Sequence, residues 1–195
     1  MNSNYFIEKL GFAFDNQTIS YDIKLLANNI GVDAVHCSGE FPAVFFKEVS
    51  DFNIDNLKEI AKIHRKIWNN SSIVFLYVVS PVEIRIYNCN ETPVFFNTEN
   101  LQIDREIKER EIETCKKSDE ETLSTLIDIF SSVAIDTGKV WISKYSSKIK
   151  LQTKVDRYLV NSLLKLAKKL SNDIEDDEII HSLLMRSIFI MYLQD

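Results

Sequence analysis

The segment from Ile179 to Asp195 constrains this sequence most, because it reads as a helix with hardly any polar face (IIHSLLMRSIFIMYLQD). Apolar side chains at positions 188–193 point in every direction around a turn of 3.6 residues, whereas a surface helix keeps one polar side. No Gly, Asn or Pro follows to cap or stop the segment. We therefore expect further polypeptide to cover this helix, and we interpret the sequence as one piece of a longer protein.

The first half of the sequence predicts an α/β domain over residues 1–97. Hydrophobic spacing and turn residues mark its elements, with Ser20 and Asn53 as helix caps and Gly31 as a helix stop. In chain order, the predicted elements are a short helix between Tyr5 and Phe12, a helix at 20–29, a hairpin of strands 32–37 and 43–49, a helix at 53–69, and strands 73–79 and 83–89. This order predicts a mixed sheet with flanking helices.

The second half, residues 98–195, is expected to be a mainly helical extension that leads into a further domain. A charged connector or solvated helix is predicted at 97–114, and amphipathic helices at 118–134 and 155–170. The residues expected to face inward from the first of these amphipathic helices are Leu123, Leu126, Ile127, Ile129, Phe130 and Val133. Ser171, Asn172 and Asp173 are the expected cap of the final helix.

Composition excludes several classes of protein. The chain is 45% hydrophobic and 27% charged, as in ordinary globular domains, and its apolar runs are too short to span a membrane. Its amino terminus lacks the pattern of a signal peptide. The three cysteines form no CxxC pair and the three histidines show no metal-binding spacing. We expect a cytoplasmic protein with no metal or other cofactor bound to this part of the chain and no membrane partner.

A basic segment, Gly138–Arg157, stands out against the net charge of −6. It follows a markedly acidic stretch and contains a single acid, Asp156. Lysines neutralise phosphates and aromatic rings contact sugars or bases, so this segment is the candidate DNA-binding region. The alternative is a solvated loop in which Trp141 is a buried anchor. The DNA-binding candidates are Lys139, Trp141, Lys144, Tyr145, Lys148, Lys150 and Lys154.

Four blocks of sequence, taken together in order, resemble a known family. They are PAVFFKEV, EIAKIHRKIWNNSSIVFLYVVSPVEIRIYNC, IDTGKVW and MRSIFIMYLQD. The set is similar to the amino-terminal region of N-6 adenine DNA methylase polypeptides of restriction-modification systems, type I-like or type IIG-like. The resemblance implies a downstream methyltransferase domain, S-adenosylmethionine as the cofactor of the parent protein, DNA as its substrate, and specificity or restriction subunits as possible partners.

The methylation chemistry itself cannot be built from these residues. Binding S-adenosylmethionine needs a Gly-rich turn, and holding a flipped adenine needs an Asn/Asp-Pro-Pro-aromatic element. The four glycines are never adjacent, and the three prolines stand alone. We therefore expect a non-catalytic module that supports DNA engagement or docks to the catalytic and specificity parts. A protein-interaction module without nucleic-acid contact is a further alternative.

The rival hypothesis is a metal-dependent endonuclease domain. The order of helix, hairpin, helix and strand, with Asp33 and Lys47, resembles a degenerate core of the PD-(D/E)xK restriction nucleases, which would use Mg²⁺. Phe45 stands where that motif requires an acid, and Glu48 is expected to point to the opposite strand face. The simpler interpretation places Asp33 after a turn and Lys47 on an exposed strand face.

Two further groups are candidate contacts with other domains. His64, Arg65 and Trp68 lie close together on the predicted helix at 53–69, where they form either a polar and aromatic contact surface or a core position for Trp68 with His64 packed above it. In the final helix, Arg186 is expected to meet a carboxylate or the absent domain. The other candidates there are Phe189 and Tyr192.

Overall fold

The chain divides into two compact units, Met1–Gln152 and Thr153–Asp195. The computed structural model describes residues 4–14, 19–70, 73–93, 103–149, 155–172, 174 and 176–194. Side chains are described for fewer residues of the second unit, from 163 to 187 with gaps.

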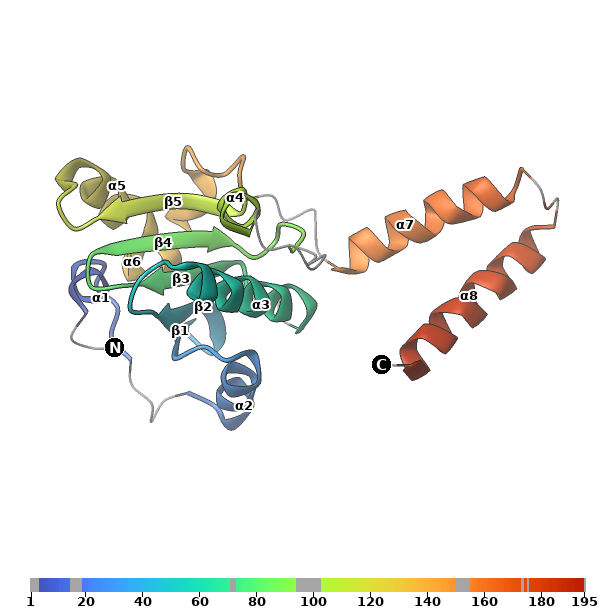
Figure 1. Cartoon of the computed structure of the whole chain (residues 1–195), viewed down its shortest axis with the longest axis horizontal. Coiled ribbons are helices and arrows are strands. Elements are labelled where there is room, and N and C mark those ends of the chain that lie inside the picture. Colours follow the sequence, from blue (N-terminus) through green and yellow to red (C-terminus); the bar gives the residue numbers. More distant parts are fainter. Residues whose placement is uncertain are drawn as a thin grey trace. The chain divides into compact units, whose positions relative to one another are not determined.

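A five-stranded sheet forms the centre of the first unit, with the strands in sequence order across it (Figure 1). The strands are β1 (Ala34–Ser38), β2 (Phe41–Glu48), β3 (Phe75–Val79), β4 (Glu83–Asn88) and β5 (Glu111–Lys116). β2 and β3 are parallel and are joined through α3 (Ile54–Asn70), while the other neighbouring pairs are antiparallel. The mixed sheet with flanking helices that the sequence predicts is confirmed.

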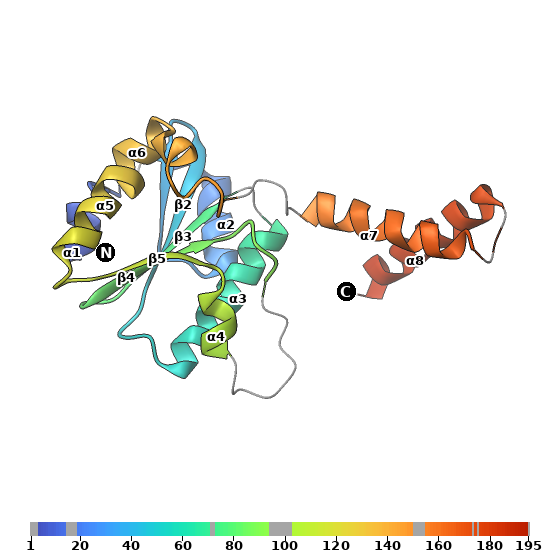
Figure 2. The ribbon, with the colours of Figure 1, turned by 90° about the horizontal axis from the view of Figure 1, so that it is seen from above.

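Helices cover both faces of this sheet (Figure 2). On one side lie α1 (Tyr5–Lys9), α5 (Glu120–Phe130), α6 (Ser132–Asp136) and the 3-10 helix η1 (Lys139–Ile142); on the other lie α2 (Tyr21–Ile30), α3 and α4 (Ile103–Lys108). Because strand side chains alternate between faces, Phe46 joins the first core and its neighbour Phe45 joins the second. All of β3 is buried, which explains the nearly continuous apolar run that precedes Ser80.

Local capping explains where the helices begin and end. The Ser20 hydroxyl accepts a hydrogen bond from the Ile23 N–H at 3.4 Å, and Gly31 ends α2 with a left-handed φ of 95°. The Asn53 carbonyl oxygen of the side chain accepts from the N–H groups of Asp55 and Asn56, both at 3.0 Å. The predicted caps at Ser20 and Asn53 and the predicted stop at Gly31 are confirmed.

The stretch predicted as a connector or solvated helix contains a strand, so the sheet does not end before residue 98. β5 pairs with β4 and buries Ile112 and Cys115, and the compact unit continues to Gln152. The charged residues Glu111 and Glu113 obscure the strand pattern in the sequence. In the folded protein, both carboxylates accept hydrogen bonds, Glu111 from the Thr114 hydroxyl and Glu113 from the Tyr145 hydroxyl. The division at 97/98 therefore does not separate a sheet domain from a helical extension.

The helix predicted at 118–134 is two helices. Ser131 adopts an extended conformation with ψ of 164° between α5 and α6, and its hydroxyl caps α6 by accepting from the Ala134 N–H at 3.3 Å. This break rotates α6 relative to the expected continuous helix. Leu123, Leu126, Ile129 and Phe130 are buried as predicted, but Ile127 and Val133 are exposed.

The second unit contains two neighbouring helices, α7 (Val155–Leu170) and α8 (Asp177–Gln194). Asp176 precedes α8, and its Oδ1 accepts a hydrogen bond from the Glu178 N–H at 2.9 Å. The described cap of α8 is therefore Asp176, later in the chain than the expected Ser171 to Asp173 cap, of which Asp173 lies outside the described residues. Within the described residues, no helix has the length and apolar content required to cross a bilayer.

Candidate functional site

The nuclease-like candidates lie at the start of β1 and near the end of β2. Asp33 precedes β1, and its Oδ1 lies 3.5 Å from the Nζ of Lys47. Its other oxygen, Oδ2, accepts a hydrogen bond of 2.7 Å from the backbone N–H of Glu48. Lys47 Nζ also lies 3.1 Å from Oε1 of Glu59, which α3 supplies. The resulting site is a lysine between two carboxylates, and Glu59 is a member that the sequence analysis missed.

Lys47 is mostly enclosed, contrary to the exposed strand position that the simpler interpretation gave it. Its side chain is 16% exposed. Burial by itself would lower the pKa of Lys47, but the hydrogen bond to Glu59 and the charge of Asp33 outweigh it and raise the pKa. The ammonium group is therefore held charged and neutralised by protein carboxylates, which leaves it poorly placed to receive a phosphate.

The position that would carry the second acid of a nuclease is apolar and closed to solvent. Phe45 has no exposed surface and belongs to the core between the sheet and α3. Glu48 is exposed and adjacent in sequence to Lys47, so its side chain leaves the strand on the other face. Among the described residues, no group of three or more His, Cys, Asp or Glu side chains is arranged to hold a metal ion.

A buried polar hub surrounds His64. Its Nε2 lies 2.8 Å from the carbonyl oxygen of Asn88, at the end of β4. The Asn88 side chain donates through Nδ2 to the Lys148 carbonyl at 2.8 Å, and its Oδ1 accepts from the Asn90 N–H at 3.0 Å. The Asn88 N–H donates to the Arg110 carbonyl at 2.8 Å. This hub joins α3, β4, the α4–β5 turn and the loop after η1.

This burial corrects part of the domain-contact prediction. His64 has no exposed surface and so cannot contact another domain, while Trp68 is half-buried and Arg65 is exposed on α3. Burial lowers the pKa of His64 from 6.5 to about 4, with a smaller opposing effect from the Asn88 hydrogen bond. His64 is therefore a neutral structural residue at physiological pH.

The basic segment is more firmly packed than its sequence indicates. The Nζ of Lys139 pairs with Asp128, and the Nζ of Lys148 donates to the Ile112 carbonyl at 3.1 Å. Tyr145 is buried and donates its hydroxyl proton to Glu113, so this ring is not available to a nucleic acid.

Lys139, Trp141, Lys144 and Lys148 are all exposed among the described residues, but protein oxygens already bind the ammonium groups of Lys139 and Lys148, which makes Lys144 and Trp141 the preferred candidates of this segment. Lys144 is exposed, with its Nζ 5.1 Å from the centre of the Tyr145 ring. Trp141 is 38% exposed and leans on Phe75 with ring centres 5.7 Å apart, which makes it a partial anchor and a partial surface residue. Lys150 and Lys154 lie outside the described residues.

A second charged cluster escaped the sequence analysis. Arg85 on β4 donates to Oε1 of Glu83 through Nε at 2.9 Å and through Nη2 at 2.7 Å, and its Nη1 lies 4.0 Å from Oε2 of Glu111. Its guanidinium lies over the Phe52 ring at 4.0 Å. Burial raises the pKa of Glu111, and the Thr114 hydroxyl and the Arg85 charge oppose that effect. Glu83 and Arg85 are two residues apart on a predicted strand, and this spacing could have indicated that their opposite charges share one face.

The candidates in the last helix are only partly described. Arg186 lies exposed on α8. Phe189 and Tyr192 belong to the same helix, but their side chains lie outside the described residues. Comparisons of the chain with protein-family models, with curated proteins and with solved structures found no match.

Proposed function

We propose that this chain is a non-catalytic amino-terminal module of a cytoplasmic restriction-modification adenine-N6 DNA methyltransferase, in which it helps the parent protein to hold DNA. The support is the ordered resemblance of its four sequence blocks to that family. The hairpin β1–β2, followed by α3 and the parallel strand β3, also resembles a degenerate PD-(D/E)xK core. S-adenosylmethionine would belong to the downstream methyltransferase domain.

The non-catalytic assignment rests on one observation: Phe45 is buried at the second acid position, beside a lysine that is already paired with two carboxylates. A nuclease of this type needs two acids to hold Mg²⁺ and a lysine that faces the attacked phosphate. Here an apolar ring occupies the second acid position, and Lys47 is neutralised by Asp33 and Glu59. We therefore propose that the strands form a framework like that of such a site, in which the second metal-binding acid is missing.

A cleavage assay with supercoiled plasmid in Mg²⁺ or Mn²⁺ tests this assignment. We expect no metal-dependent cleavage by the wild-type chain, and the same background from Asp33→Ala and Lys47→Ala. Lys62→Ala, an exposed position on α3, is the matched control for contaminating nuclease. Metal-dependent cleavage that survives in Lys62→Ala and disappears in both site variants would establish the endonuclease alternative instead.

DNA engagement is assigned to the surface formed by Lys144 and Trp141. An exposed lysine gains affinity for phosphate by releasing counterions, and an exposed indole edge can contact a sugar or a base. Lys148 is unsuitable as a probe, because its ammonium group donates to the Ile112 carbonyl and its replacement would also remove that contact within the protein. Lys144 is the better probe, because its replacement leaves the contact between Lys148 and the Ile112 carbonyl in place.

Lys144→Glu should weaken binding of a short DNA duplex about tenfold at low salt, and Lys144→Ala should reduce the slope of log K against log salt by about one. Fluorescence anisotropy across a salt series measures both quantities. Lys24→Ala, on the exposed side of α2, should leave affinity and slope unchanged. Undetectable binding by the wild-type chain would favour a protein-interaction module that does not touch nucleic acid, and equal losses in the Lys24 and Lys144 variants would contradict the assignment of DNA engagement to the Lys144 surface.

A further inference from the structure

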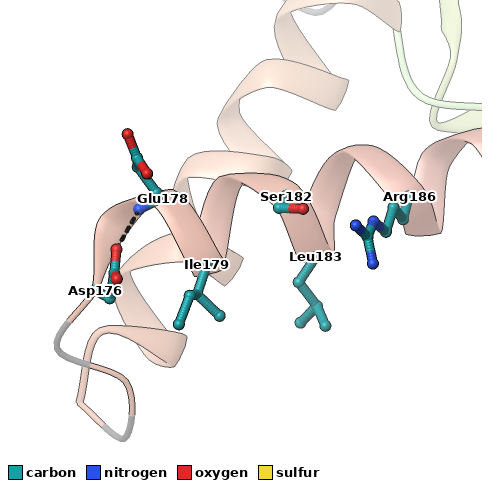
Figure 3. Close-up of a pocket in the computed structure, with 6 residues that line it drawn as sticks. All are labelled: Asp176, Glu178, Ile179, Ser182, Leu183 and Arg186. Atoms are coloured by element: carbon teal, nitrogen blue, oxygen red, sulfur yellow. Dashed lines mark hydrogen bonds between the residues drawn. The ribbon is translucent and has the colours of Figure 1, made fainter.

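One side of α8 presents apolar and charged side chains in a regular order (Figure 3). A shallow depression of about 390 Å³ follows this side. Ile179 and Leu183 project from the same side of the helix, with Ser182 between them in sequence. The lining residues are Asp176, Glu178, Ile179, Ser182, Leu183 and Arg186.

This side is distinct from the one that α8 buries within the second unit. Ile180 and Leu184 are buried, and α7 is the neighbour of α8 in that unit. Ile179 and Leu183 are instead 54% and 48% exposed. Two large aliphatic side chains one turn apart, both about half-exposed, form an apolar stripe that the hairpin itself does not cover.

The stripe and the charges at its ends have the spacing of a coiled-coil seam. Asp176, Ile179, Leu183 and Arg186 follow one another at intervals of three, four and three residues. These intervals are those of the a and d positions of a heptad, which place side chains along one line of contact between two helices. Over the part of α8 whose side chains are described, the seam begins with an acid and ends with a base, and its two middle positions are aliphatic.

We infer that this seam pairs with the same seam of a second copy of the chain, with the two α8 helices antiparallel. In that arrangement, each a position faces a d position of the other copy. Ile179 then meets Leu183 of the second copy, and Asp176 meets its Arg186. Each contact occurs twice about a two-fold axis at the level of residue 181, the midpoint of both pairs, and the small side chain of the neighbouring Ser182 flanks the seam there.

Charge order selects both the partner and the direction. A parallel pair of α8 helices would place Asp176 against Asp176 and Arg186 against Arg186, whereas the antiparallel pair converts both repulsions into attractions. Asp176 is already ordered as the cap of α8 through its Oδ1, and a carboxylate can accept further hydrogen bonds at its second oxygen. The sequence of the seam is therefore complementary to itself.

Charge-reversal variants of the full chain test the pairing by sedimentation equilibrium at about 100 µM. The wild-type chain should form dimers. Asp176→Arg alone and Arg186→Asp alone should each raise the dimer dissociation constant at least tenfold, because each variant sets like charges against each other. An equimolar mixture of the two variants should dimerise again, because every charged contact in the mixed pair is complementary. Circular dichroism monitors any loss of helix from removal of the Asp176 cap.

Two apolar positions on the same helix provide a matched comparison. Leu183→Asp should abolish the dimer, whereas Met185→Asp should leave it intact, because Met185 is 68% exposed and lies outside the seam. A wild-type chain that remains monomeric at this concentration would overturn the inference. Equal effects of the Leu183 and Met185 variants, or a mixture of charge variants that stays monomeric, would overturn it as well.

Discussion

Arg85→Met should lower the free energy of unfolding by about 3–5 kcal/mol at pH 7, because it leaves two largely buried carboxylates without their cation. Glu83 and Glu111 each expose only 12% of their side chains, and Arg85 supplies the charge between them. Methionine keeps much of the side-chain volume over Phe52, so the loss reports charge and hydrogen bonding more than packing. Urea unfolding followed by circular dichroism measures the difference.

Acidification should reduce the loss of stability caused by Arg85→Met, and the direction of this change follows from the pKa of Glu111. Burial raises the pKa of Glu111 in the folded protein, so the folded state takes up a proton before the unfolded state as pH falls. Loss of the Arg85 charge enlarges that effect, and protonation removes an unpaired buried charge. The deficit should be smaller at pH 5 than at pH 7. Replacing Glu83 and Glu111 by Gln in the Arg85→Met background should restore most of the stability; a deficit below about 1 kcal/mol at pH 7 would contradict a structural role for this cluster.

The free energy of unfolding should also fall by about 3 kcal/mol between pH 7 and pH 4 through His64 alone. The folded protein holds the pKa of this imidazole at about 4, compared with 6.5 when it is solvated. Over this pH interval, His64 is therefore protonated in the unfolded chain and largely neutral in the folded chain. Stability is fully present above pH 6.5, declines as pH falls towards 4, and stops declining through this group once both states are protonated.

His64→Gln isolates this contribution from that of the acids. Glutamine can still donate a hydrogen bond to the Asn88 carbonyl but does not titrate. The difference in stability between wild type and variant should shift by about 3 kcal/mol in favour of the variant from pH 7 to pH 4. His181→Gln, an exposed position on α8, is the control and should track the wild type. A wild-type and His64→Gln pair with parallel pH profiles would show that His64 is not buried in neutral form.

The predictable parts of the fold were those with a local physical signal. Ser20, Gly31 and Asn53 mark helix ends through their own backbone or side-chain chemistry, and the apolar run that forms β3 reflects burial on both faces. β5 could not be found in this way. From the sequence alone, the acids of β5 look like residues of a solvated segment. In the folded protein, partners from other elements bind them, as Tyr145 binds Glu113.

The candidate site shows the same limit. Asp33 and Lys47 were found because a spacing links them, and the structure places them 3.5 Å apart. Glu59 was missed because α3 brings it to Lys47 from a separate element. The aromatic and basic pattern of residues 138–149 resembles a DNA-binding surface in one dimension. In three dimensions, Tyr145 and Lys148 are committed to contacts inside the protein.

The hub at Asn88 has a consequence for the order in which the protein can be completed during synthesis. The side-chain amide of Asn88 donates to the carbonyl of Lys148, which follows it by 60 residues, and its backbone N–H donates to the carbonyl of Arg110. A nascent chain that has emerged only as far as the end of β4 would expose one strand edge and leave these polar groups to solvent. The hydrogen bonds of this hub can therefore be complete only after the loop that follows η1 has left the ribosome.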